Sequence, residues 1–275
     1  MSAFTTPEPI TATLTTAGAR VRVVASERSD TVVRVEPVDS ASSSDVKVAE
    51  KTKVDFSSGA LSVKTTKSGA KDGSVAITIE LPAGSKLVLN TAWTDVHTDG
   101  LFGDCELNIA SGHVRLDRVA ALRGNLAAGE VTVGHVAGPV DLEGGTAGIR
   151  IGEAAGVVRY RGSTGKVWIG HALADVDLGG SGGSFVIDQA DGNVITKAAD
   201  CPIRIGRMTR GQAELMNAAG GIEVGIGEGV TAWVDADSTK GAVRNSLPAQ
   251  NKAESSVKVF ARTRLDDIVI HRAAA

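Results

Sequence analysis

The sequence predicts an all-β fold, a right-handed parallel β-solenoid whose 18-residue coils each consist of two nine-residue steps. Aliphatic pairs with one residue between them return every nine positions, which is strand periodicity with both side chains on one face. The intervals between pairs are rich in turn-forming Gly, Ala, Ser, Thr, Asp and Asn, and helical i, i+3, i+4 spacing is absent there. Between Gly138 and Gly170 the pairs are Val140/Leu142, Ile149/Ile151, Val158/Tyr160 and Val167/Ile169.

The same pattern extends in both directions from this segment. One-residue slips interrupt it at Leu122 and before Ala213. The further pairs are Val114/Leu116, Val131/Val133, Val176/Leu178, Phe185/Ile187, Val194/Thr196, Ile203/Ile205, Ala213/Leu215 and Ile222/Val224.

Two steps make one coil, because strands that recur after two steps can stack in parallel about 4.8 Å apart. The general preference for right-handed crossovers predicts the hand. A single coil buries about four aliphatic side chains, each contributing roughly 1.5–3 kcal/mol. Ordering each residue costs on the order of 1–2 kcal/mol. A lone coil therefore cannot fold, and stacked coils must stabilise one another.

Non-repeat strands are expected to cap both ends, since a bare terminal coil exposes open strand edges. Residues 1–90 are predicted to form an N-terminal β cap with the strands "RVRVVAS", "TVVRVEPV", "GALSVKT" and "SVAITIELP", the polar turn "DSASSSD" and the loop "TKSGAKDGS". Residues 91–246 hold the solenoid repeats. Residues 247–275 are predicted to contribute the C-terminal capping strands "SSVKVFART" and "DIVIH".

Composition narrows the function classes. The formal net charge of −3 shows no excess of basic residues of the kind that binds nucleic acid. No stretch approaches the roughly 20 apolar residues of a membrane span. The segment "MSAFTTPEPITATL" has neither a basic n-region nor an apolar h-region, so we expect a cytoplasmic protein. Cys105 and Cys201 show no metal or redox spacing and are expected to be unpaired thiols.

The chain resembles a known family along nearly its whole length. The resemblance is carried by "PEPITATL", "TAWTDVHTDG", repeats such as "SGHVRL", "AGEVTV" and "TGKVWIG", and then "GVTAWVDADSTKGAVRNSL" and "VKVFARTRLDDIVIH". These segments resemble the actinobacterial putative-adhesin β-strand-repeat family, a domain of unknown function. The resemblance implies a strand-repeat fold and adhesion by analogy, and it assigns no catalytic or ligand residue. The chain departs from the family's usual Gly-Asp before each strand, where it has Glu130, Pro139, Lys166, Ser184 and Pro202.

The register predicts a binding face, because outward residues one coil apart become neighbours. Arg150, Trp168, Val186 and Arg204 form such a column. An exposed Trp flanked by Arg has the composition of an interface hot spot, and Arg150 is placed to stack on Trp168. The competing interpretation is that another strand of the chain folds over this patch.

Two other columns favour structural roles. Arg123, Asp141, Arg159, Asp177, Ile195 and Glu214 alternate in sign and predict a ladder of surface ion pairs. The corner column Asp117, His135, Glu153, His171, Gln189 and Arg207 contains metal-ligand types. Donors spread along a line do not converge on a zinc ion, so a polar corner is favoured and no metal is expected.

Specific activities find little support. The glycine-rich turns lack the full calcium β-roll motif, "GSGGS" lacks the trailing Lys-Ser/Thr of a phosphate loop, and no Ser/His/Asp group emerges. Trp93 and Trp233 are expected to plug the two ends of the repeat core.

We therefore expect a non-enzymatic scaffold or binding protein without cofactor, which presents flat solenoid faces to a protein or other macromolecular partner. The alternatives are a self-assembling structural protein and, less favoured, a β-helix enzyme acting on a polysaccharide.

Overall fold

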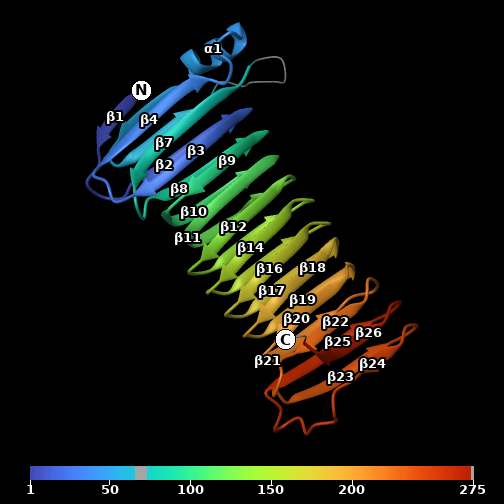
Figure 1. The fold of residues 1–275 in the computed structure, drawn as a ribbon. Coiled ribbons are helices and arrows are strands. Elements are labelled where there is room, and N and C mark those ends of the chain that lie inside the picture. The colour runs from blue at the N-terminus through green and yellow to red at the C-terminus, as the bar shows by residue number, and fades with distance from the viewer. Residues whose placement is uncertain (66–72, 274–275) are drawn as a thin grey trace. The chain divides into compact units, whose positions relative to one another are not determined.

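The computed structural model describes residues 1–65 and 73–273, and it confirms a right-handed parallel β-solenoid (Figure 1). Most of the predicted loop "TKSGAKDGS" lies outside the described residues. The chain divides into two compact units, residues 1–137 and 138–275. The predicted domain boundaries near residues 90 and 246 stay predictions.

The first unit contains the strands β1 to β12 and one helix. The helix is α1 (Ser43–Lys51). The strands are β1 (Ser2–Thr5), β2 (Thr11–Ala17), β3 (Ala19–Ser26), β4 (Asp30–Pro37), β5 (Lys53–Ser57), β6 (Ala60–Lys64), β7 (Val75–Pro82), β8 (Lys86–Ala92), β9 (Thr94–Asp99), β10 (Leu101–Ile109), β11 (Gly112–Leu126) and β12 (Glu130–Val136).

The coil formed by β2 and β3 is inserted between two coils that follow it in the chain. β2 pairs in parallel with β6 on one side and β8 on the other. β3 likewise lies between β7 and β9, again with parallel pairing. Its alternating pattern buries Val21 and Val23 and turns Arg20 and Arg22 outward.

Antiparallel strands protect the edges of β6 and β7. β5 pairs with β6 and β4 pairs with β7, and β1 pairs with the other side of β4. The rings of Phe4 and Phe56 stack across this end at 4.8 Å. These strands use the backbone groups that an open edge would expose.

The segment predicted as the polar turn "DSASSSD" instead leads into helix α1. The Ser42 hydroxyl caps it by accepting a hydrogen bond from the Asp45 N–H at 3.3 Å. The buried Asp45 carboxylate accepts hydrogen bonds from the N–H groups of Ser74 and Asp39, and the former is the main reason that its pKa is lowered. An S-x-x-D capping signal was therefore present in the sequence.

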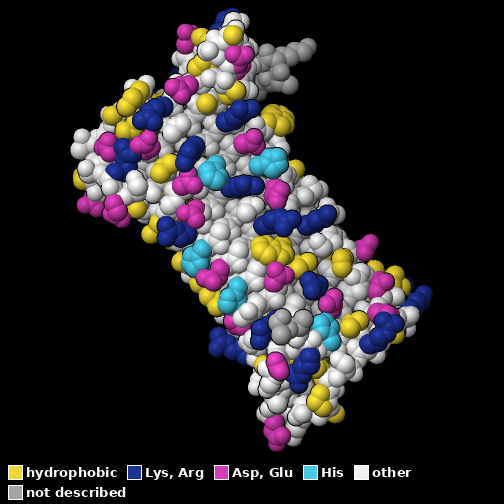
Figure 2. All heavy atoms as spheres, viewed as in Figure 1, with side chains coloured by type: hydrophobic (Ala, Val, Ile, Leu, Met, Phe, Trp, Pro, Cys, Tyr) yellow, Lys and Arg dark blue, Asp and Glu magenta, His cyan; other side chains and the backbone are white. Residues whose placement is uncertain are grey.

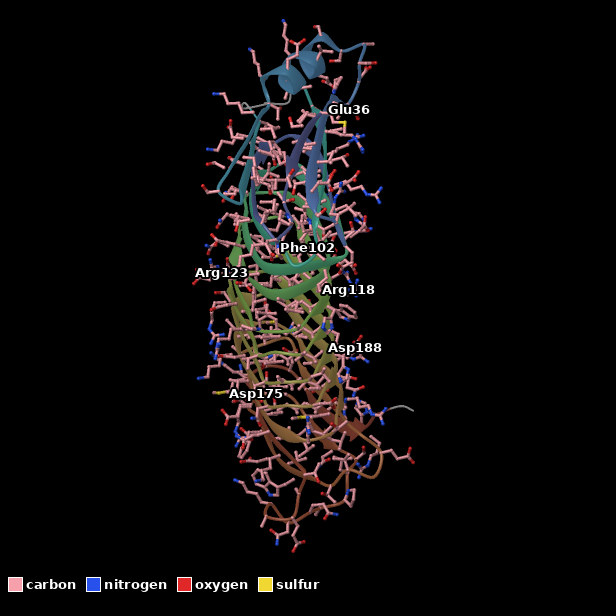
Figure 3. The ribbon with its side chains drawn as sticks, turned by 90° about the vertical axis from the view of Figure 1, so that its left-hand side faces the viewer. Glu36, Phe102, Arg118, Arg123, Asp175 and Asp188 are labelled. Atoms are coloured by element: carbon pink, nitrogen blue, oxygen red, sulfur yellow. The ribbon has the colours of Figure 1, made fainter. Side chains whose placement is uncertain are left out.

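β11 turns a corner of the coil and belongs to two faces. Its first half pairs with β12 and its second half with β10. Figure 3 accordingly shows Arg118 and Arg123, both on β11, on opposite sides, with Phe102 between them. Phe102 is fully buried, so the core lies between the two faces.

The second unit contains the remaining strands. They are β13 (Val140–Gly144), β14 (Gly148–Ala154), β15 (Val158–Gly162), β16 (Lys166–Ala172), β17 (Val176–Gly182), β18 (Ser184–Ala190), β19 (Val194–Asp200), β20 (Ile203–Met208), β21 (Gly211–Met216), β22 (Ile222–Ile226), β23 (Ala232–Ser238), β24 (Val243–Asn245), β25 (Val257–Thr263) and β26 (Ile268–Arg272).

The predicted coil register is confirmed in this unit. Val140 pairs with Val158, Val158 with Val176, and Val176 with Val194, all in parallel strands 18 residues apart. The predicted slip before Ala213 is also present, since Ala213 pairs with Val194 after 19 residues. All of these side chains are buried.

Tyr160 interrupts the aliphatic column and is accommodated by glycines. Its side chain is only 2% exposed and packs edge-on against Phe185. A Cβ at Gly162 would lie 1.9 Å from the phenol oxygen, and one at Gly165 would lie 2.2 Å from it. These glycines are required because the backbone makes room for the ring.

The order of the last coils differs from the order in the chain. β25 lies between β21 and β23, and β26 lies between β22 and β24. The final strands are therefore inside the stack, and β23 with β24 forms the terminal coil.

Candidate functional site

The predicted binding face is a continuous row in the second unit. Arg150 pairs with Trp168, Trp168 with Val186, and Val186 with Arg204, on β14, β16, β18 and β20. Both arginines are exposed, whereas Trp168 and Val186 are half-buried. The register is as predicted, and the role of this row in binding stays a prediction.

Intrachain contacts already engage part of this row. The Trp168 indole N–H donates to the Asp188 carboxylate at 3.1 Å, on the side of the unit where Figure 3 labels Asp188. The ring lies over Gly170, where an added Cβ would be 3.1 Å from it. Arg204 forms an ion pair with Glu223 at 3.4 Å. Trp168 is thus fixed in place and offers one ring face at most.

The predicted ion-pair ladder has the right register but the wrong partners. Asp177 pairs with Arg161 and not with its register neighbour Arg159. Arg161 prevails because its guanidinium also donates to the carbonyl oxygens of Tyr160 and Asp177, at 2.8 and 3.1 Å. Arg123 pairs with Glu106 of the preceding coil. In the part of the chain that the structure describes, no ion pair joins Arg159 to Asp141 or to Asp177.

The corner column forms a hydrogen-bonded network around Asp191. Its carboxylate interacts with His171 at 2.7 Å and accepts a hydrogen bond from the Thr209 hydroxyl at 2.6 Å. Burial opposes ionisation of Asp191, but the hydrogen bonds from Thr209, His171 and Gln189 outweigh it and hold its pKa below the ordinary value. The other His171 nitrogen is 3.8 Å from Glu153. The network stabilises the corner.

Neither Trp93 nor Trp233 plugs the core, so that prediction was wrong. Trp93 is 71% exposed. Trp233 is half-buried and lies beside Lys258 on the outward side of β23, where its ring packs against Phe260 at 5.1 Å. The Lys252 ammonium sits 4.5 Å from the centre of the Trp233 ring. Side chains alternate between the two faces of β23. Its neighbour Ala232 pairs with Val257 and both are buried, so Trp233 points outward.

A groove of about 540 Å³ lies on the outward face of the first unit, over β7, β3, β9, β11 and β12. Figure 2 shows basic, acidic and histidine side chains mixed on the face over β3 and β9. The outward residues form two rows that cross the strands. These rows are Ala76, Arg20, Asp95, His113 and Glu130, and Thr78, Arg22, His97, Arg115 and Thr132.

The charges in this groove are unequally paired. Asp99 forms an ion pair with Arg22 at 3.0 Å and also contacts His97 at 3.1 Å. Asp95 contacts His113 at 3.1 Å. Arg20 and Arg115 are exposed, and neither has a side-chain ion pair or hydrogen bond within residues 1–65 and 73–273. Two guanidinium groups therefore remain available to a ligand.

The groove is not evident from the sequence, although its residues follow the same alternation. "RVRV" and "DVHT" each place a basic side chain between two inward residues. The spacing does not reveal that β3 and β9 are neighbours, because 75 residues separate Arg20 from Asp95. Only the inserted coil brings the two rows together.

The two cysteines are buried and the described residues form no metal cluster. Both cysteines are free, as predicted, and burial is the main cause that raises the pKa of Cys105 to about 12 and that of Cys201 to about 11. Neither thiol is a ready nucleophile near neutral pH. No group of three or more His, Cys, Asp or Glu side chains could hold a metal ion in the described portion of the chain.

No helix among the described residues is both long enough and apolar enough to cross a bilayer.

Comparisons of the sequence give no family assignment. No protein-family model matches it, and no curated protein matches it.

Comparisons of the fold match several solved structures, three of which are described below. A putative adhesin from Parabacteroides merdae is 12% identical, with a TM-score of 0.41 and coverage of 98% of this chain and 95% of that one. A putative adhesin from Bacteroides fragilis is 10% identical, with a TM-score of 0.36 and the same coverage. A putative cell adhesion protein from Clostridium sporogenes is 9% identical, with a TM-score of 0.19 and coverage of 98% of both chains.

These organisms are Bacteroidetes and Clostridia, so the predicted actinobacterial origin has no support from them.

Proposed function

We propose that the chain is a non-enzymatic binding protein and that the groove over β3, β9 and β11 holds an extended anionic partner. The observation that carries this proposal is the presence in the groove of Arg20 and Arg115, which have no carboxylate partner among the residues that the structure describes. Arg donates several hydrogen bonds in a fixed geometry that suits carboxylates. The backbone N–H and C=O groups of these strands are already paired within the sheet, so a ligand in the groove contacts side chains.

The positions of the two arginines suit a long ligand. They lie on β3 and β11, which are separated by β9, and they are two residues apart along the strand direction. Strand spacing and rise place their backbones about 12 Å apart on the diagonal. A polymer that carries carboxylates at intervals can pair with both arginines through separate groups.

The test measures binding to two immobilised carboxylated polymers, polyglutamate and polygalacturonate, at rising salt. The proposal expects binding to at least one, weakened by salt and by Arg20→Ser/Arg115→Ser. Arg264→Ser is the matched control, because Arg264 is exposed and lies outside the groove. Equal binding by the wild type and the double variant would refute the site.

Self-association is the second candidate, favoured by the terminal coil. Among the described strands, β23 pairs only with β25, and β24 only with β26. Antiparallel strands cover β6 and β7, so stacking through β23 and β24 alone stops at a dimer. Light scattering tests this, since a mass that remains at 28.1 kDa at high concentration excludes it.

A further inference from the structure

The groove combines hydrogen-bond donors and acceptors at close spacing. Arg20, Asp95 and His113 are successive members of one row, on three adjacent strands. Arg22, His97 and Arg115 form the row beside it. A ligand lying across these strands therefore meets guanidinium and imidazole groups on both sides of a carboxylate. A chain of hydroxyl groups with occasional carboxylates complements this pattern, because each hydroxyl both donates and accepts.

The same groove offers little to a peptide. Its apolar lining comes from the small side chain of Ala76, which is half-buried, and from Val21, Ile77, Val96 and Val114, which are at most 4% exposed. Anchoring side chains of a peptide normally fill desolvated pockets. β3, β9 and β11 are each paired on both sides, so a peptide cannot add as a strand.

An exposed aromatic ring lies close to the groove in the chain. Trp93 precedes Asp95 by two residues, is 71% exposed and has a φ of 47°. In the neighbouring coil, Gly18 occupies the position equivalent to Trp93, because Ala17 pairs with Ala92 and Arg20 pairs with Asp95. Gly18 has a φ of 68°. A left-handed Trp is strained, whereas glycine is not, and such strain concentrates at functional sites. An exposed indole offers a flat apolar face on which a sugar ring can stack.

We infer that the groove binds a carboxylated polysaccharide, with Arg20 and Arg115 on its carboxylates and Trp93 against a sugar ring. This inference rests on the proposed function and names the class of its ligand. No bond is formed or broken.

The experiment measures equilibrium binding of the full chain to polygalacturonate, to methyl-esterified polygalacturonate and to polyglutamate. We expect polygalacturonate to bind, and esterification to weaken binding about tenfold or more because it removes the carboxylates but keeps the sugar. Arg20→Ser/Arg115→Ser and Trp93→Gly should each weaken binding to polygalacturonate to a similar degree. Arg264→Ser should not change it. Thermal melts of every variant establish that the fold is retained.

The outcomes separate the two proposals. Groove-dependent binding of polyglutamate that equals or exceeds that of polygalacturonate overturns the polysaccharide and leaves the binding function in place. Equal binding of the esterified polymer overturns the role of the carboxylates, and full affinity in Trp93→Gly overturns the role of the ring. The absence of binding to all three polymers overturns the inference together with the proposed function.

Discussion

Replacing Tyr160 with phenylalanine should stabilise the protein. The ring is 2% exposed, and its hydroxyl has no hydrogen-bond partner among the described residues. Burial is the main reason that the pKa of this phenol is raised. The hydroxyl is thus removed from water without compensation, while the ring itself fills the core.

The magnitude follows from what the substitution removes. An unsatisfied buried hydroxyl costs about 1–3 kcal/mol. Tyr160→Phe removes this cost and keeps the edge-on contact with Phe185, at a centroid distance of 6.2 Å. We expect the free energy of unfolding to rise by about 1 kcal/mol.

Thr31→Val is the matched control, because it also deletes a buried hydroxyl. The Thr31 and Thr6 hydroxyls are 2.8 Å apart, and both residues are buried. This substitution leaves Thr6 unsatisfied and should lower the free energy of unfolding by about 1–3 kcal/mol. The two variants should therefore have opposite signs.

Urea unfolding, followed by circular dichroism and by tryptophan fluorescence, measures both changes. If the dependence of the unfolding free energy on urea concentration is unchanged, the shift of the midpoint reports a change in stability. A decrease of more than about 0.5 kcal/mol in the free energy of unfolding of Tyr160→Phe, which lies outside the range of neutral substitutions, would refute the cost assigned to the buried hydroxyl.

Further predictions concern packing, pH and thiol reactivity. Gly162→Ala places a Cβ 1.9 Å from the Tyr160 oxygen and should lower the free energy of unfolding by about 1–3 kcal/mol in the same assay, and an unchanged midpoint would contradict the packing. The pKa of Asp191 is lowered on folding, so its stabilising contribution is present above its ordinary value of 3.8 and is lost as the pH falls below it. Asp191→Asn should therefore be less stable than wild type at pH 7, with a difference that shrinks in acid, and parallel pH profiles would exclude this. Cys105 and Cys201, with pKa values of about 12 and 11, should react with a thiol reagent at pH 8 only after unfolding in urea. Reaction of the folded protein at the unfolded rate would show that they are accessible.

The sequence by itself determined the coil. The recurrence of pairs such as Val140/Leu142 and Val158/Tyr160 predicted the strands, their inward faces and their parallel register. It did so because alternation within a strand and the nine-residue step are local properties. Helix α1 was also signalled locally, by Ser42 and Asp45, but it lay within a stretch interpreted as a turn.

Only the tertiary structure decided which coils are neighbours. β2 and β3 lie between later coils, and β25 and β26 lie inside the stack, although all coils present the same alternating pattern. Any parallel strand can satisfy the backbone of another, so the pattern does not fix the order. Arg20 meets Asp95 only through this insertion, and the partner of Asp177 depends on carbonyl contacts of Arg161 that a register does not encode. The groove is therefore a product of coil order, which the periodicity of the chain does not contain.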